Sequence, residues 1–217
     1  MSDVRLWSYY RSSASWRVRI ALHFKGLAFE YRPVNLLAGE QLSEAYRAVN
    51  PLGAVPTLEL DGHRLSESMA LVEYPEETRP QPPLLPKTPL ARARARRIAE
   101  AINAGIQPLQ NLRVLRKLDA DFHAGAAGQK AWGAHFNEVG LAAVEALAQE
   151  SAGRCCVGDE VTVADVFLVP QLSGARRFGV DLGAFPTLVR LEAELEQLPA
   201  FARAHPRAQP DCPPDQR

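Results

Sequence analysis

The chain has 217 residues, and 25 Lys and Arg balance 25 Asp and Glu, so its formal net charge at pH 7 is zero. This balance excludes a global basic field for nucleic acid or an anionic membrane, so any recognition of anions must be local. No apolar stretch approaches the roughly 20 residues that cross a bilayer, and the N-terminus lacks the charged-then-apolar layout of a signal peptide. We therefore expect a cytoplasmic protein that binds neither nucleic acid nor membrane.

The first part of the chain alternates between strand and helix patterns. The predicted elements are a strand over 4–10, a helix over 12–25, a strand over 28–34, a short helix over 41–47, strands over 55–60 and 63–65, and a helix from 69. Asp61-Gly62 predicts a hairpin turn between the last two strands. Ser66-Glu67-Ser68 is predicted to cap the last helix. The order is βαβαββα, and its first βαβ unit has parallel strands.

A proline-rich stretch divides the chain. Its prolines are Pro80, Pro82, Pro83, Pro86 and Pro89, which exclude a helix interior and predict an extended linker. Beyond it the pattern is wholly helical, with predicted helices over 90–116, 129–149, 163 onward and 185–198, and a tail over 206–217. Thr162 and Asp165 form a capping-box pattern before the third of these helices. The predicted domains are therefore 1–79 and 90–217, joined by a linker over 80–89.

The start of the predicted helix over 12–25 can hold an anion. Ser12, Ser13 and Ser15 lie at or near its N-cap, where the first N–H groups have no internal partner and carry partial positive charge. In such surroundings the pKa of a thiol falls from about 8.5 to roughly 3.5–7.5. An ordinary serine cap is the alternative interpretation of this segment. The cysteines are Cys155, Cys156 and Cys212, so a thiol at this helix start must come from a ligand.

Four motifs together resemble those of one enzyme family. They are Ser12-Ser13-Ala14-Ser15-Trp16-Arg17-Val18-Arg19, Gly105-Ile106-Gln107-Pro108-Leu109-Gln110-Asn111-Leu112, Cys156-Val157-Gly158-Asp159-Glu160-Val161-Thr162 and Val180-Asp181-Leu182. The first is similar to the Ser-Ser-Cys-Ser-Trp-Arg-Val-Arg signature of zeta-class glutathione transferases, the family of maleylacetoacetate isomerases. The resemblance runs nearly end to end. It implies a cytosolic glutathione transferase fold, with an α/β thioredoxin-like N-terminal domain and an all-α C-terminal domain, in a homodimer.

The resemblance also implies the site residues. Residues matched to glutathione binding are Ser12, Ser13, Ala14, Ser15, Trp16, Arg17, Gln41, Val55, Glu67, Ser68, Gln107 and Asn111. Ser12 would donate to the glutathione sulfur, with Ser13 beside it as a further catalytic residue. The backbone of Val55, before the family's cis-proline, would pair with the tripeptide, and Ser68 would hold its γ-glutamyl end at a helix start. Arg177 would bind the substrate carboxylate as the third catalytic residue, and further candidates for substrate binding are Arg11 and Arg113.

The implied activity is glutathione-dependent cis–trans isomerisation of maleylacetoacetate to fumarylacetoacetate, in the catabolism of tyrosine and phenylalanine. A thiolate nucleophile suits a cis enedione because its addition turns the double bond into a single bond that can rotate. Maleylpyruvate isomerisation and a broader transferase activity on α-halo acids are alternatives. A non-catalytic glutathione-binding module is the least favoured one. The histidines show no ligand spacing, so no metal site is predicted.

The sequence departs from the family pattern at three positions. Ala14 replaces the cysteine of the signature, and Glu67 replaces a glutamine. Pro75 stands where the family has leucine. Because proline inside a helix removes a hydrogen bond and costs about 3 kcal/mol, Pro75 predicts a helix that kinks or ends early.

Overall fold

The computed structural model describes residues 4–217, which form two compact units. Among the described residues, one unit runs up to Leu84 and includes Gln197–Arg217, and the other is Leu85–Glu196. The C-terminal residues thus belong with the first unit, whereas the sequence pattern placed them in a helical domain over 90–217. Across the described residues, every helix is too short or too polar to be a candidate membrane span.

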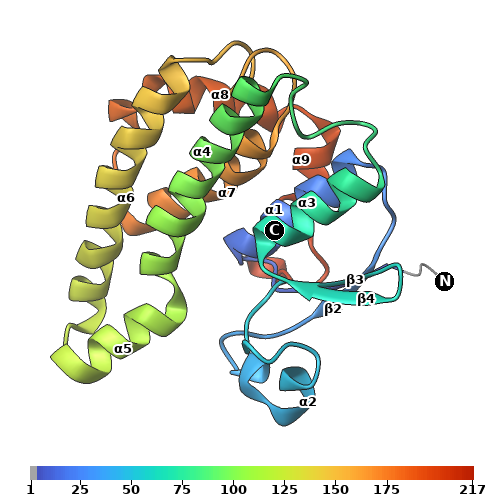
Figure 1. Cartoon of the computed structure of the whole chain (residues 1–217). Helices are drawn as coiled ribbons and strands as arrows, with labels where there is room; N and C mark the ends of the chain where they lie inside the picture. The colour runs from blue at the N-terminus through green and yellow to red at the C-terminus, as the bar shows by residue number, and fades with distance from the viewer. Residues whose placement is uncertain (1–3) are drawn as a thin grey trace. The chain divides into compact units, whose positions relative to one another are not determined.

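The first unit contains a four-stranded mixed sheet with the order β2-β1-β3-β4 (Figure 1). The strands are β1 (Arg5–Ser8), β2 (Glu30–Pro33), β3 (Thr57–Leu60) and β4 (His63–Ser66). β1 pairs with β2 in parallel, as the βαβ pattern predicted, and β3 is antiparallel to both β1 and β4. Asp61 and Gly62 have φ values of 55° and 76°, so the hairpin has the left-handed turn that Asp-Gly favours.

The helices of this unit follow the predicted order. They are α1 (Ser13–Phe24), the 3₁₀ turn Glu40–Leu42, α2 (Glu44–Arg47), α3 (Ser68–Thr78), α9 (Pro199–Ala204) and the 3₁₀ turns Pro206–Ala208 and Pro214–Gln216. α1 and α3 cover one face of the sheet (Figure 1). The core between them includes Leu6 of β1, Leu22 of α1 and Leu71 of α3. The βαβαββα prediction is therefore confirmed.

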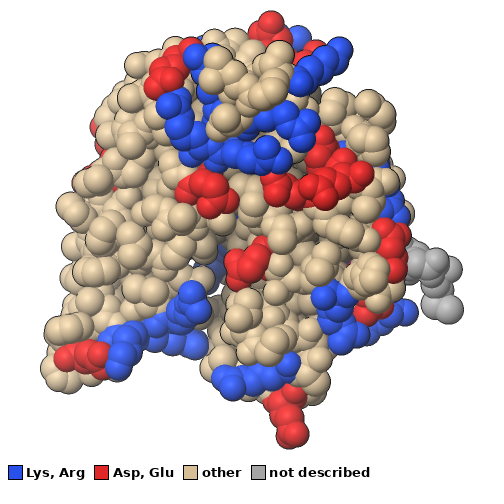
Figure 2. All heavy atoms as spheres, in the orientation of Figure 1, with Lys and Arg blue, Asp and Glu red and all other residues tan. Residues whose placement is uncertain are grey.

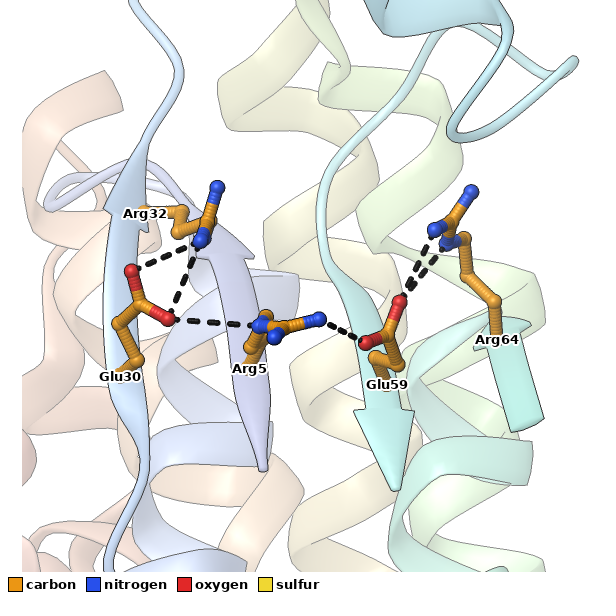
Figure 3. Close-up of polar contacts among 5 residues, drawn as sticks. All are labelled: Arg5, Glu30, Arg32, Glu59 and Arg64. Carbon is orange, nitrogen blue, oxygen red and sulfur yellow. Dashed lines mark hydrogen bonds and ion pairs between the residues drawn. The ribbon is translucent and has the colours of Figure 1, made fainter. Parts of the chain in front are cut away.

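The opposite face of the sheet is charged (Figure 3). Arg5 alternates with the buried Leu6 and so points away from the core. It pairs with Glu30 at 3.4 Å and with Glu59, which also binds Arg64 at 2.9 Å. The hydrogen bond from Arg64 and the charge of Arg5 hold the pKa of Glu59 below its usual range. Opposite charges thus alternate across the strands, and this face carries no strong field of one sign.

Two expectations about α3 are wrong, the serine cap and an early end at Pro75, while a kink at Pro75 stays a prediction. Its N-cap is Glu67, with φ 70°, and no side chain caps the helix, whereas Ser66-Glu67-Ser68 was expected to provide a serine cap. The helix also continues past Pro75 to Thr78, and the N–H of Arg79 still bonds to the Pro75 carbonyl at 2.9 Å. Pro75 is buried in the packed face of the helix. Packing of that face offsets the hydrogen bond that proline removes.

The second unit is all-helical. Its elements are α4 (Pro89–Gly105), the 3₁₀ turn Gln107–Gln110, α5 (Leu112–Phe122), α6 (Gly125–Gln149), α7 (Val163–Phe178), the 3₁₀ turn Leu182–Ala184 and α8 (Pro186–Glu196). The predicted capping box of Thr162 and Asp165 is present. The single helix predicted over 90–116 is wrong, because α4 ends before Ile106, two residues ahead of Pro108, and α5 is a separate helix. α6 runs close to this break: a Cβ at Gly140 would lie 2.3 Å from the Ile106 side chain.

Candidate active site

Ser12 is the N-cap of α1, as the sequence predicted. Its N–H donates to the Tyr9 carbonyl at 3.0 Å, and its Oγ accepts from the N–H of Ser15 at 3.2 Å. Capping uses a lone pair of the hydroxyl oxygen, so the hydroxyl proton stays available for donation. No acidic residue lies in the first turn of α1. The capping role and the expected contact with a thiolate are therefore compatible in one side chain.

The residues after Ser12 lead from half-buried to buried positions. Ser13 and Ala14 are half-buried at the helix start, and Ser15, Trp16 and Arg17 are buried. Within residues 4–217, neither the Ser15 Oγ nor the Trp16 Nε1 has a hydrogen-bond partner. Buried polar atoms without partners are rare, and a bound polar ligand is one explanation for them.

Arg17 links α1 to the start of α3. Its side chain is fully buried, and one guanidinium nitrogen donates to the Ser68 Oγ at 3.1 Å. Ser68 is the first residue of α3, and among residues 4–217 the Glu67 N-cap makes no side-chain capping hydrogen bond. The start of a helix carries partial positive charge. The positive φ of Glu67 places this non-glycine residue in a strained backbone conformation of the kind found at binding sites. A carboxylate suits this helix start.

Val55 and Gln41 present polar groups of the kind a peptide would use. The Val55-Pro56 bond is cis, as predicted. Within the described residues, the backbone N–H and C=O of Val55 take part in no hydrogen bond, so both can pair with an extended peptide. Gln41 is buried, and its Oε1 has no donor among residues 4–217. These groups, with the α1 and α3 N-termini, fit the amides, carboxylate and thiol of glutathione.

The second unit holds Gln107, Asn111 and Arg113 around one helix start. Gln107 opens the 3₁₀ turn, and Asn111 caps α5 by accepting from the N–H of Arg113 at 3.2 Å. Arg113 is exposed, and Lys and Arg side chains gather over α5 at the lower left of Figure 2. A buried hydrogen bond holds the 3₁₀ turn Gln107–Gln110. Gln110 is buried and accepts from the Asn137 amide at 2.6 Å.

The two neighbouring arginines at the end of α7 differ in their environments. Arg176 is held by a two-pronged ion pair with the buried carboxylate of Glu192, which raises the pKa of the arginine. Arg177 is exposed, and its guanidinium lies 5.9 Å from the Phe178 ring centroid. Arg176 therefore connects α7 to α8, whereas the Arg177 side chain is exposed to solvent. Arg11, in the first unit, is also exposed.

Sequence reasoning missed two residues that support the Ser12 loop. Arg19 was part of the quoted signature and Asp211 part of the C-terminal tail, but neither was given a role. Both contact the backbone just before Ser12. Nothing in their spacing signals this, because the two residues are far apart in the chain. Among residues 4–217, no cluster of three or more His, Cys, Asp or Glu could hold a metal ion.

Comparison with known proteins gives a consistent result. Residues 6–83 match a family model described as the N-terminal domain of glutathione S-transferase. A probable maleylacetoacetate isomerase 2 of Drosophila melanogaster is 50% identical over 218 residues, covering 99% of this chain and 93% of that relative.

Solved structures agree in fold. A maleyl pyruvate isomerase, described as a bacterial glutathione-S-transferase in the zeta class, superposes with a TM-score of 0.94 at 40% identity, covering 96% of this chain and 100% of the other. A maleylacetoacetate isomerase from Anaeromyxobacter dehalogenans 2CP-1, with glutathione bound in its active site, has a TM-score of 0.88 at 48% identity, covering 97% and 98%. The chain belongs to the zeta-class glutathione transferases, the family that includes the maleylacetoacetate isomerases.

Proposed function

We propose that this protein is a glutathione-dependent isomerase that converts maleylacetoacetate to fumarylacetoacetate, a step in the catabolism of tyrosine and phenylalanine. The observation that carries the proposal is the geometry of Ser12, whose oxygen caps α1 while its proton remains available beside the positive helix end. Glutathione, when bound, supplies the thiolate nucleophile for the cis double bond. The nearly full-length relative from Drosophila supports the substrate class.

Each residue of this chain has a defined task in the proposal. Ser12 donates a hydrogen bond to the sulfur and, with Ser13 and the α1 N–H groups, favours its anionic form. Val55 holds the tripeptide through its backbone, and Ser68 at the α3 start holds a carboxylate. Arg177 binds a carboxylate of the substrate, for which its planar guanidinium is suited.

The remaining predicted residues complete these tasks. We assign Ala14, Ser15, Trp16, Arg17, Gln41, Glu67, Gln107 and Asn111 to glutathione binding, and Arg11 and Arg113 to further contacts with the substrate. The buried Gln41 Oε1 and Ser15 Oγ, which have no hydrogen-bond partner within residues 4–217, support their assignment.

The test of the proposed function is Ser12→Ala. Loss of one hydrogen-bond donor to a developing or resting anion lowers kcat by about 10²–10³. The pKa of the glutathione thiol in the complex, followed by the ultraviolet absorbance of the thiolate, is expected to rise. Thr88→Ala is the matched control, because Thr88 caps α4 in the same way, at 3.3 Å from the N–H of Ala91. Both variants lose a helix cap worth about 1 kcal/mol of stability, and only Ser12→Ala loses activity.

Two results would contradict the proposal. An unchanged thiol pKa in Ser12→Ala would remove Ser12 from the sulfur site. Tight glutathione binding without isomerisation of any maleyl substrate would favour a non-catalytic binding module instead.

Maleylpyruvate is the second candidate substrate. The maleyl pyruvate isomerase superposes with the higher TM-score, although the Anaeromyxobacter enzyme is closer in sequence. Measuring kcat/KM on both maleyl substrates decides between them, and we expect maleylacetoacetate to be preferred. Turnover of an α-halo acid is expected to be a slower side activity of the same site.

We further propose that the protein is a cytoplasmic homodimer. Cys155, Cys156 and Cys212 are buried free thiols, which suits a reducing compartment. The homodimer follows from the family resemblance, and sedimentation equilibrium of the purified chain tests it. A monomeric mass would refute this part of the proposal without affecting the proposed chemistry.

A further inference from the structure

A buried guanidinium holds the backbone just before Ser12. Arg19 of α1 is fully buried, and its Nε donates to the Ala204 carbonyl at 3.0 Å. Its other nitrogens donate to the Tyr9 carbonyl at 3.3 Å and the Tyr10 carbonyl at 2.9 Å. The Tyr9 carbonyl also accepts from the N–H of Ser12. One side chain therefore ties the turn that leads into α1 to the C-terminal end of α9.

The C-terminal tail, residues 206–217, holds the same turn from the other side. Asp211 Oδ2 accepts from the backbone N–H of Tyr10 at 2.9 Å, and its Oδ1 accepts from the Tyr31 hydroxyl at 2.6 Å. The Tyr10 hydroxyl donates to Gln216 Oε1 at 2.9 Å. Cys212 lies in one buried apolar cluster with Tyr9 and Tyr10. The tail is thus attached through hydrogen bonds and apolar packing, and it bonds to main chain as well as to side chains.

Tyr10 is consequently held through both of its backbone polar groups. Its N–H is bound by the carboxylate of Asp211, and its C=O is bound by the guanidinium of Arg19. The carboxylate of Asp211 and the guanidinium of Arg19 have opposite charges. Burial lowers the pKa of Arg19 to about 10, while the charge of Asp211 acts in the opposite direction, so Arg19 remains a cation at neutral pH. Only Arg11 separates this doubly held residue from Ser12.

We propose that Asp211 is a positioning residue for the glutathione thiolate: through the Tyr10 N–H, it fixes the turn that aims the Ser12 hydroxyl. The inference rests on the proposed function, because it takes Ser12 as the donor to sulfur. Charge-assisted hydrogen bonds such as that from Tyr10 are about twice as strong as neutral ones, which suits a fixed loop. A misplacement of about 1 Å at a reacting group lowers rates by up to about a hundredfold.

The experiment compares Asp211→Ala, Asp211→Asn and Asp215→Ala in the full chain. Asp215 is an exposed acid on the same tail and serves as the matched control. We expect Asp211→Ala to raise the pKa of the bound glutathione thiol by about one unit and to lower kcat about tenfold. The Kd for glutathione is expected to change less than threefold or so, because Val55 and Ser68 hold the rest of the tripeptide.

The asparagine variant separates positioning from general stability. Asp211→Asn keeps an oxygen that can accept from the Tyr10 N–H but loses the charge, so its thiol pKa and kcat are expected to lie between those of the wild type and Asp211→Ala. Amide hydrogen exchange at Tyr10, measured without glutathione, is expected to speed up in the same order. Asp215→Ala is expected to match the wild type in every measurement.

Several outcomes would overturn the inference. One is Asp211→Ala with a lower thermal midpoint but the wild-type thiol pKa and kcat, because Asp211 would then be structural only. If Asp211→Ala does not fold, the inference is overturned by an Asp211→Asn variant that has the wild-type thiol pKa, the wild-type kcat and unchanged amide exchange at Tyr10. Failure of the proposed function has a different signature: the wild-type complex itself would show no lowering of the thiol pKa, and that result would remove the inference as well.

Discussion

Lys25, at the C-terminal end of α1, anchors the segment that leaves the first unit. Its side chain is fully buried, and its ammonium lies 2.7 Å from Glu76 Oε2, 2.8 Å from the Arg79 carbonyl and 2.9 Å from the Pro82 carbonyl. Three N–H donors thus meet three oxygens. Glu76 Oε2 also accepts from the backbone N–H of Leu84 at 2.9 Å. We predict that Lys25→Met, which keeps the length of the side chain, strongly destabilises the protein.

The magnitude follows from what Lys25→Met leaves behind. Removing one partner of a buried ion pair costs about 3–5 kcal/mol, because the other charge loses its compensation. The carbonyls of Arg79 and Pro82 also lose their donor. Glu76→Gln is expected to cost less, about 1.5–3 kcal/mol, since its amide oxygen can still accept from Lys25 and Leu84. In the double variant the two effects are expected to be less than additive.

The assay is urea unfolding of the wild type, both single variants and the double variant. Lys117→Met is the matched control, because it breaks an exposed pair with Asp121 at 2.9 Å and is expected to cost less than about 0.5 kcal/mol. The reasoning is refuted if the free energy of unfolding of Lys25→Met lies within about 1 kcal/mol of the wild-type value, or if Lys25→Met is destabilised no more than Lys117→Met.

Three further predictions concern single residues of the two units. Burial, followed by the charges of Arg207 and Arg19, lowers the pKa of His205, so the unfolded chain takes up the proton first and stability falls as the pH drops below about 6.5. His205→Gln is expected to make the urea midpoint depend less on pH between about pH 7 and 5. A variant whose midpoint falls as steeply as that of the wild type contradicts this. Arg177→Ala is expected to lower kcat/KM for the maleyl substrate by about 1.5–3 kcal/mol while leaving the glutathione Kd near its wild-type value; equal loss for both ligands would refute the assigned role. Ala14→Cys is expected to change kcat only a few-fold and to add a mixed disulfide with oxidised glutathione, seen by intact mass; activation of an inert wild type by about a hundredfold would refute the proposed enzyme.

Much of the first unit could be predicted because its signals are local. The alternation around Leu6, the serine before α1 and the Asp61-Gly62 turn each fix an element within a few residues. Two of the predictions that differ from the structure concern prolines. Pro108 should have ended the helix predicted over 90–116, since a proline marks a helix boundary just before it. At Pro75 the helix continues instead, because tertiary packing of α3 overrides the local preference.

The candidate site was predictable only where one segment carries it. Ser12 could be placed because cap, helix and motif are contiguous. The bond from Arg17 to Ser68 spans 51 positions and the bond from Tyr10 to Asp211 spans 201, so no spacing rule connects them. These long-range pairs form because α1 packs against α3 and the tail contacts the residues just before α1. The pairs also connect the contiguous motif and the residue pair before it to α3 and to the tail.

The distribution of charge in the two units predicts a particular response to salt. Arg19, which binds the backbone before Ser12, and Arg17, which binds Ser68, are fully buried. Arg113 and Arg177, proposed to meet the substrate, are exposed. Salt screens exposed charges strongly, with a Debye length of about 10 Å at 0.1 M, and buried charges much less. A chain with zero net charge has no global field to lose. Raising NaCl from about 0.05 to 0.5 M should therefore raise KM for the maleyl substrate several-fold and shift the pKa of the bound glutathione thiol by less than about 0.3 units. A thiol pKa that rises with salt while KM stays constant would show that exposed charges, rather than Ser12 and the N–H groups of α1, set the field at the sulfur.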